Sequence, residues 1–515
     1  MIPPVDDPSR SQALSPDAPP SWTAAPVTPT MPLWLAAVAF VLMVLPWLEP
    51  FAPGPSAAAV PLMFAWFCSS IVLGLASWRE PQLVAWAWLV AALVAALFGL
   101  LQYFGATEIA FGLANYTDPG TAYGNLRQRN QFASQLSIGT LAALYLAKQG
   151  LDRRWAALAI ALLAVANAAS TSRTGLVELL LIALVTLLWE DRGGPRTTRL
   201  SLTALAVYVL AAFLLPLALQ TFTEYEAPGL FDRVSSSPGC SSRMVLWSNV
   251  LELIGERPLF GWGIAELDYA HYAHLYGGAR FCDILDNAHN LPLHVAVELG
   301  VPIALLFVGG LAWWIWRHRP WRETDPVRQL AWGVLMVVGL HSLLEYPLWY
   351  GPFQLATLLS VLLLHGRGRA ALAPMWRNTL RVVALGVLPL GLGYAGWDYH
   401  RISQLYLQPQ ERSPAYREQT LAKARASWIF ARQVKFAELS ITPLTRNNAR
   451  DIHALALDML HFSPEPKVIE ATIDSAMVLH DEPTALWHMA RYKAAFPKDY
   501  EEWLADNASL RRKRE

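Results

Sequence analysis

The chain has 515 residues, of which 54% are hydrophobic and 16% charged, and its formal net charge is zero. A soluble protein usually carries about 25% charged residues, so the composition argues against a soluble enzyme. A neutral chain also lacks the overall positive field typical of nucleic-acid-binding proteins, and we expect no nucleic-acid partner. The apolar residues occur in blocks of about 20, the length that crosses a bilayer. The sequence therefore predicts an all-α polytopic membrane protein in contact with membrane lipids.

The first 30 residues differ from the rest of the chain. They are rich in proline and polar residues, and they lack a basic n-region and a cleavage-site pattern. We interpret residues 1–30 as a disordered cytoplasmic tail and not as a signal peptide.

Eleven apolar segments follow this tail. The expected transmembrane helices lie near 31–48, 56–77, 82–103, 130–148, 154–170, 175–190, 199–220, 291–316, 327–346, 347–366 and 378–398, with only a tight turn between the ninth and tenth. Lysine and arginine gather in every second connection, as at 148–154, 192–199, 317–328 and 367–381. The positive-inside rule then places the N-terminus in the cytoplasm of a bacterial inner membrane. Because the number of spans is odd, the C-terminus is expected in the periplasm.

The spans divide the chain into domains. Transmembrane helices 1–7 occupy 31–220, a large periplasmic loop occupies 221–290, and helices 8–11 occupy 291–398. Residues 399–515 form a periplasmic tail with helix-like stretches at Glu418–Leu439, Ala449–His461 and Val468–Phe496. This tail resembles packed helical hairpins without a regular repeat, and it either binds a protein or caps the fold.

The three cysteines fall into two groups. Cys240 and Cys282 both lie in the large outward loop, where the compartment permits disulfides, and we expect them to pair. Cys68 lies inside the second span and is interpreted as a packing residue.

Polar residues on the outward side gather in four short islands. The first runs from Gly124 to Gln131 and leads into the fourth span, with Arg129 and Asn130 near its end. Charged groups at membrane depth cost about 3 kcal/mol or more and usually have a function.

The second island, Ser170–Gly175, is a turn between two short spans and contains Arg173. Short spans place the turn below the membrane surface, where a poorly hydrated guanidinium favours an anion. The alternative is an ordinary interfacial arginine that reaches the lipid headgroups.

The third island ends at Arg243, which opens an amphipathic helix predicted over Met244–Gly255. Ser241 or Ser242 can cap this helix. A helix N-terminus beside a guanidinium is suited to bind phosphate. An exposed first-turn arginine is the alternative.

The fourth island, Asp286–Asn290, holds His289 where the loop meets the eighth span. A histidine there can accept a proton from an acceptor hydroxyl near neutral pH. A hydrogen-bonded structural histidine is the alternative. Glu298 is nine positions further on, on roughly the opposite helical face, and is not an obvious partner for His289.

A hairpin near Glu345 and Tyr346 lies at the same depth as the four islands. Trp349 and Tyr350 also fit an aromatic belt at the membrane interface. The sequence contains no cluster of metal ligands and no glycine-rich nucleotide loop, so an outward site with arginines points to a lipid diphosphate donor.

Several of these motifs resemble a known family. They are Ser172-Arg173-Thr174-Gly175, Arg243-x-x-x-Trp247, Arg257-Pro258-Leu259-Phe260-Gly261-Trp262-Gly263, His289-Asn290 and Glu298-Leu299-Gly300. Their order over residues 120–350 resembles the O-antigen ligase and polymerase superfamily. The segments Arg129-Asn130-Gln131 and Glu345-Tyr346-Pro347, with the long tail, look most like its bacterial protein O-oligosaccharyltransferase branch.

The resemblance implies a GT-C-like fold and transfer of a glycan from undecaprenyl diphosphate to a serine or threonine of a periplasmic protein such as pilin. It implies no metal, nucleotide or other cofactor. His289 would be the catalytic residue, and Arg173 and Arg243 would hold the diphosphate. Gln131 and Tyr346 match positions that this branch uses. Three further residues are expected to support the site: Arg129, Asn290 and Glu298.

Two other functions remain open from the sequence. An O-antigen ligase or polymerase would use the same chemistry with a different acceptor, and the sizeable tail only mildly favours a protein acceptor. A polytopic transporter would carry ionisable residues near mid-span, whereas Glu178 is the main example here and lies close to a span end.

Overall fold

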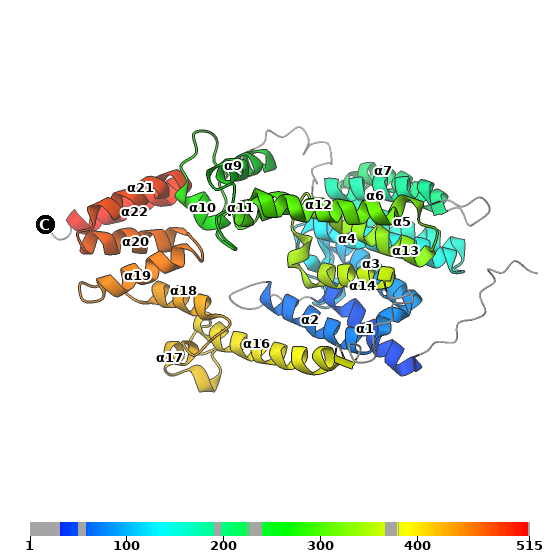
Figure 1. Ribbon diagram of the computed structural model, residues 1–515, viewed down its shortest axis with the longest axis horizontal. Coiled ribbons are helices and arrows are strands. Elements are labelled where there is room, and N and C mark those ends of the chain that lie inside the picture. The colour runs from blue at the N-terminus through cyan, green and yellow to red at the C-terminus, as the bar shows by residue number, and fades with distance from the viewer. Residues whose placement is uncertain are drawn as a thin grey trace, which may run out of the picture.

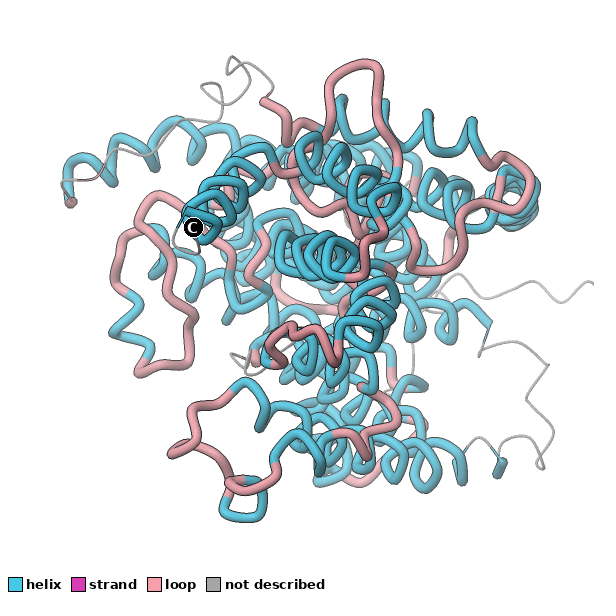
Figure 2. Tube along the Cα trace, turned by 90° about the vertical axis from the view of Figure 1, so that its left-hand side faces the viewer, coloured by secondary structure: helices cyan, strands magenta, loops and turns pink. Residues whose placement is uncertain are grey.

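The computed structural model describes residues 31–49, 58–189, 197–223, 225, 239–365, 378–379 and 381–512. The expected tail over 1–30, part of the loop 221–290 and the arginines near 192–196 and 367–377 lie outside these ranges. The regular structure in the described ranges consists of helices without strands, as Figure 2 shows.

Nine of the described α-helices pack into one bundle (Figure 1). Its members are α1 (Leu33–Leu48), α2 (Ala59–Gly74), α3 (Pro81–Tyr103), α4 (Arg129–Lys148), α5 (Arg153–Ala169), α6 (Arg173–Leu188), α7 (Thr197–Phe222), α13 (Pro326–Ser342) and α14 (Gly351–His365). Helix α4 is buried at every position from Gln131 to Ala147 and packs against α3, α5, α6 and α13. Small residues permit this close contact, because a Cβ added at Gly139 would lie 2.3 Å from the Cβ of Ala92.

The bundle agrees with a helical membrane protein. Among the described residues, three helices are long and apolar enough to cross a membrane: Pro81–Tyr103, Thr197–Phe222 and Val301–Arg322. Three more apolar helices, α1, α2 and α14, are shorter. Helices α4 to α7 begin and end within two residues of the predicted spans. The count of eleven spans stays a prediction.

The structure corrects three details of the predicted spans. The eighth is divided at Gly300 into α11 (Leu291–Leu299) and α12 (Val301–His318). The ninth and tenth are joined by the eight-residue segment 343–350 and not by a tight turn. The last described span continues to Ser403, through a π-helical turn at Val383–Val387 and then α16 (Leu388–Ser403).

The tail after α16 forms a separate helical layer, drawn from yellow to red in Figure 1. It contains α17 (Thr420–Ala424), α18 (Ala431–Ile441), α19 (Ala449–Leu460), α20 (Pro466–Val478), α21 (Glu482–Ala495) and α22 (Pro497–Arg512). Successive helices α18 to α22 pack on one another, as predicted for helical hairpins. The stretch Val468–Phe496 is two helices, because the chain turns at His480, whose φ is +60°.

The large loop connects this layer to the bundle. It contains α9 (Arg243–Glu256) and α10 (Leu267–Ala273). Tyr272 of α10 is buried in the core of the tail, where its hydroxyl lies 2.7 Å from Nδ1 of His488. Arg491 of α21 donates a hydrogen bond of 2.7 Å to the carbonyl of Ala273. The tail therefore holds the loop that carries the fourth polar island.

Candidate active site

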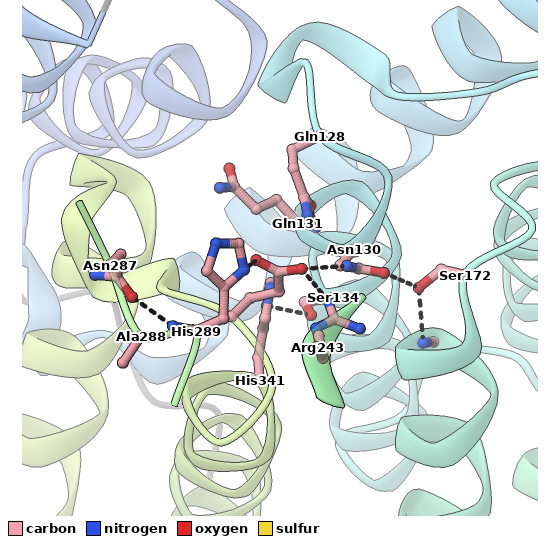
Figure 3. A network of polar contacts seen from close by, with 12 residues as sticks. Gln128, Asn130, Gln131, Ser134, Ser172, Arg243, Asn287, Ala288, His289 and His341 are labelled. Carbon is pink, nitrogen blue, oxygen red and sulfur yellow. Dashed lines mark hydrogen bonds and ion pairs between the residues drawn. The ribbon is translucent and has the colours of Figure 1, made fainter. Parts of the chain in front are cut away.

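Asn130, Arg243 and His289 belong to one network of polar side chains (Figure 3). Glu345 lies at its centre, because its carboxylate contacts all three. Its Oε2 is 2.7 Å from Nδ1 of His289. Its Oε1 accepts hydrogen bonds from the guanidinium of Arg243 and, at 3.1 Å, from Nδ2 of Asn130. The carboxyl group is buried, whereas the Arg243 side chain is 33% exposed. One carboxylate thus joins three segments that are far apart in the sequence.

The network continues from Asn130 to the start of α6. Ser172 donates a hydrogen bond of 2.7 Å to Oδ1 of Asn130 and accepts one of 3.1 Å from the backbone N–H of Gly175. Ser172 is therefore the N-cap of α6 and also fixes the Asn130 amide, whose other end faces Glu345. All four predicted polar islands contribute a residue to this one network.

The backbone around His289 holds its ring in place. His289 has a φ of +49°, which is unusual for a residue with a side chain and typical of functional sites. Its N–H donates to Oδ1 of Asn287 at 2.8 Å, and the indole of Trp247 donates to the carbonyl of Ala288 at 3.1 Å. The ring of Tyr346 meets the His289 ring edge-on, with 4.9 Å between centroids.

These contacts favour one tautomer of the imidazole. A carboxylate beside Nδ1 favours the tautomer that carries its proton on Nδ1, so that Nε2 of His289 keeps its lone pair. No other described residue binds Nε2. Burial raises the pKa of the nearby Asp286 carboxyl. In this tautomer, Nε2 of His289 can accept a proton.

The other predicted donor-binding arginine lies at the edge of this network. Arg173 is the first residue of α6, directly after Ser172, and its side chain is exposed. No hydrogen bond or ion pair joins its guanidinium to another residue in the described ranges. The N-terminal end of α6 adds a partial positive charge at the same place. Arg173 is therefore available to bind an anion, whereas Arg243 is already paired with the carboxylate of Glu345.

The remaining predicted residues take different positions. Gln131 is buried, and its Oε1 has no hydrogen-bond partner among the described residues. Asn290 caps α11 through the N–H of Leu293 and donates to the carbonyl of Leu343, which ties the His289 segment to the Glu345 segment. Arg129 instead contacts Tyr123, outside the network.

Glu298 does not join His289. Its carboxylate accepts a hydrogen bond of 2.8 Å from the N–H of Ala265 and lies 3.6 Å from Nε2 of His294. It belongs to a backbone junction in which Gly261 and Gly300 lie at the crossing of two segments. The motifs over 257–263 and 298–300 therefore fasten the loop to α11 and support the site indirectly.

This junction requires its glycines. A Cβ at Gly300 would lie 2.2 Å from the carbonyl oxygen of Leu259, and one at Gly261 would lie 2.4 Å from the carbonyl of Glu298. Both glycines also have positive φ, +89° and +69°. The N–H of Val301 donates across the crossing to the carbonyl of Pro258 at 2.8 Å.

The sequence analysis missed a second layer of buried polar residues one helical turn below the first. Ser134 follows Asn130 by four positions on α4, and His341 precedes Glu345 by four. The Ser134 hydroxyl contacts Nδ1 of His341 at 2.8 Å and donates to the carboxyl group of Glu178. The only sequence signal was this spacing, since residues four apart lie on one helical face.

Cys240 and Cys282 form a disulfide, with 5.5 Å between their Cα atoms. Cys240 stands three residues before Arg243 and Cys282 seven residues before His289. The bond therefore ties the start of α9 to the segment that carries the histidine. Cys68 is buried within α2 and is not part of this bond.

The chain is similar to several known protein families. Residues 157–308 match the family model described as "O-Antigen ligase", and residues 122–147 match "Protein glycosylation ligase". Residues 329–510 match "Virulence factor membrane-bound polymerase, C-terminal". A general O-oligosaccharyltransferase from Acinetobacter baylyi is 25% identical over 276 residues, which cover 51% of this chain and 47% of the relative. The alignment thus spans about half the length of the curated relative.

The helical fold and these matches support the class of protein: a membrane protein of the O-antigen ligase type, the Wzy-C superfamily. The match to a protein glycosylation ligase and the relative from Acinetobacter baylyi narrow the assignment. Within this superfamily, the findings support membership of the O-oligosaccharyltransferases, the enzymes of O-linked protein glycosylation.

Proposed function

We propose that this protein transfers an oligosaccharide from undecaprenyl diphosphate to a serine or threonine of a periplasmic protein such as pilin. It acts in the bacterial inner membrane, with its N-terminus in the cytoplasm and its C-terminus in the periplasm, and without a metal ion. The observation that carries the proposal is the imidazole of His289, held at Nδ1 by Glu345 and open at Nε2, beside the guanidinium of Arg243.

His289 is proposed as the general base. As the acceptor oxygen forms a bond to the anomeric carbon, Nε2 takes the hydroxyl proton, and the bond between that carbon and the diphosphate oxygen breaks. The electron pair of the broken bond leaves on the diphosphate. Glu345 stabilises the imidazolium that results. A positioned base contributes roughly 10²–10⁴ in rate.

The arginines are proposed to bind the leaving diphosphate. Arg173 presents an exposed guanidinium at the positive end of α6, and Arg243 stands beside the base. Guanidinium groups form paired, charge-assisted hydrogen bonds to phosphate oxygens. In a site of reduced dielectric they stabilise the charge that develops on the leaving group.

A second candidate function has direct support. The model "O-Antigen ligase" covers the segment 157–308, which contains Arg173, Arg243 and His289. The same chemistry directed at lipid A core or at a growing glycan would make the protein a ligase or polymerase. The acceptor is what separates the two proposals.

The test is glycan transfer by the purified full-length protein in liposomes. The donor is an undecaprenyl-diphosphate oligosaccharide, and a pilin-like protein and lipid A core are offered in parallel. Transfer to protein that disappears in His289→Ala supports the first proposal. If glycan is transferred only to lipid A core or to another glycan, the first proposal is replaced by the ligase or polymerase proposal. Unchanged transfer by His289→Ala refutes the role of the histidine in either.

A matched control is His274→Ala in the same loop. The His274 ring contacts Glu252 at 2.9 Å and Glu256 at 2.7 Å, on the far part of α9. We expect this variant to transfer glycan like the unmodified protein. Arg173→Ala and Arg243→Ala are expected to weaken use of the donor, with partial recovery in the lysine variants because a lysine lacks the planar fork.

A further inference from the structure

A deep groove lies between α2 and α16, away from the network around Glu345. Its volume of about 960 Å³ is at the upper end of the roughly 300–1,000 Å³ typical of small-molecule sites. Helix α2 lines it with Val60, Met63, Phe64 and Phe67, which share one face by their spacing of three and four. This wall is wholly apolar.

The facing wall, formed by α16, carries two residues without a side chain. It includes Gly393 and Gly396, and a Cβ added at either would have no atom within 4 Å. At Gly74 of α2, by contrast, an added Cβ would lie 2.3 Å from the Leu385 side chain. The two glycines of the groove are therefore not needed for helix contact, although glycine destabilises a helix interior. What they provide is open space along the groove.

The groove changes from apolar to polar along its length. Its lining starts at Pro389 and Leu392 and ends at His400, Ser403 and Glu411, where α16 leaves the bundle. Helix α2 begins near that polar end, because Ala59 and Val60 pack with Tyr399 in one cluster. A groove that is apolar at one end and polar at the other fits a lipid that lies along the two helices with its headgroup beside the tail domain.

The charged residues at the polar end of the groove indicate which lipid headgroup it can bind. Among the described residues that line the groove, none is a lysine or arginine, and Glu411 supplies a carboxylate. The guanidinium of the neighbouring Arg412, which is not a lining residue, is bound within the chain: it donates to the carbonyl of Leu407, at the edge of the groove, and to the hydroxyl of Thr420. Ser413 and His400 add hydrogen-bonding groups 3.2 Å apart. A diphosphate or an anionic glycerol headgroup would meet a negative charge, whereas an ammonium group would be attracted.

We propose that this groove binds one aminophospholipid of the phosphatidylethanolamine class. An acyl chain lies against Phe64, Phe67 and the glycines of α16, and the ammonium group pairs with Glu411. The site is distinct from the proposed donor site at Arg173 and Arg243 and does not depend on the reaction proposed above.

A neighbouring face of α2 connects the groove to the Glu345 segment. Trp66 donates a hydrogen bond of 2.6 Å to Oε1 of Gln354, and Nε2 of Gln354 donates one of 2.7 Å to the carbonyl of Leu348. Leu348 stands two residues after Tyr346. A lipid that supports α2 thus also supports the segment that presents Glu345, and its loss is expected to lower the melting temperature of the protein.

The experiment is native mass spectrometry of the full chain, purified in mild detergent and offered equal amounts of phosphatidylethanolamine, phosphatidylglycerol and undecaprenyl phosphate. We expect one retained phosphatidylethanolamine. The double variant Gly393→Leu, Gly396→Leu fills the groove and is expected to lose it. Gly391→Leu, on the same helix but outside the lining, is the matched control and is expected to retain it.

A second variant keeps the test independent of folding. Glu411→Gln changes one exposed group, and we expect the preference for phosphatidylethanolamine over phosphatidylglycerol to fall about two- to fivefold, as for an exposed ion pair. Equal retention of the two phospholipids by the unmodified protein would overturn the proposal. Retention of undecaprenyl phosphate instead would also overturn it, and would assign the groove to the carrier lipid.

Discussion

Replacing Glu345 by glutamine tests the proposed site most directly. The substitution keeps the shape of the side chain and removes its charge. In the structure, Arg243 and Asn130 both donate to Oε1, and His289 faces Oε2. The amide oxygen of the glutamine is expected to remain with the two donors. Its NH₂ group then faces Nδ1 of His289.

The size of the effect follows from that orientation. An NH₂ group donates to Nδ1, which moves the imidazole proton to Nε2 and removes the lone pair that would accept the acceptor's proton. We therefore expect kcat to fall by roughly 10²–10⁴, the full contribution of a positioned base. Loss of the charged acceptor should also lower the free energy of unfolding by about 1–3 kcal/mol. Raising the pH should not restore activity, because the neutral ring has the wrong tautomer.

The assay is the liposome transfer reaction with saturating donor, accompanied by a thermal melt of each variant. Glu298→Gln is the matched control, because its amide oxygen can still accept from the N–H of Ala265. That variant should keep the kcat of the unmodified protein. Normal turnover by Glu345→Gln would refute the idea that this carboxylate orients His289.

Three more substitutions test the supports of the site. Gly300→Ala should destabilise the protein by more than about 2 kcal/mol in a thermal or denaturant melt, because of its positive φ and the carbonyl of Leu259 at 2.2 Å; an unchanged melt would contradict the tight crossing. Replacing Cys240 and Cys282 by serine should cost about 4 kcal/mol for a loop closed over 42 positions and increase proteolysis of the loop, and resistance equal to the unmodified protein would argue against this role. Trp247→Phe removes the hydrogen bond to the carbonyl before the histidine and should lower kcat by up to about 100-fold with little change in melting temperature; a full rate would show that the indole is not needed for positioning.

Much of the site was accessible from the sequence because polar residues stand out against apolar spans. The islands that hold Asn130, Ser172, Arg243 and His289 were predicted to share one side of the membrane, and the structure joins them. Helical periodicity also separated Glu298 from His289, and the two residues do lie apart. The expected disulfide between the two loop cysteines is present in the structure.

The centre of the network was harder to predict. Glu345 contacts Asn130 across 215 positions of sequence, and periodicity describes only one helix at a time. The segment near Glu345 also fitted an aromatic belt at the membrane interface, which made the role of Glu345 harder to predict. Ser134 and His341 were overlooked for the same reason, since they contact each other across 207 positions of sequence.

The division of the eighth span had a different cause. Residues 291–316 have nearly continuous hydropathy, so the spacing of apolar residues favoured one helix. The break at Gly300 is imposed by another segment that crosses it, and hydrophobicity carries no information about such a crossing. The motif Glu298-Leu299-Gly300 was recognised in the sequence. Its role as a junction became visible only from the position of Gly261 in the structure.

The pairing of Arg243 with Glu345 has a consequence for donor selection. If Arg243 grips the donor as proposed, an incoming anion must compete with a carboxylate that the protein supplies itself. A diphosphate that Arg173 also engages can compete, whereas a lipid with a single phosphate gains less from the exchange. After the glycan has been transferred, Glu345 can pair with the guanidinium of Arg243 again. This pairing weakens the binding of the remaining undecaprenyl diphosphate. In the proposed mechanism, Glu345 thus competes with bound anions for Arg243, which disfavours membrane lipids with a single phosphate and favours release of the product carrier.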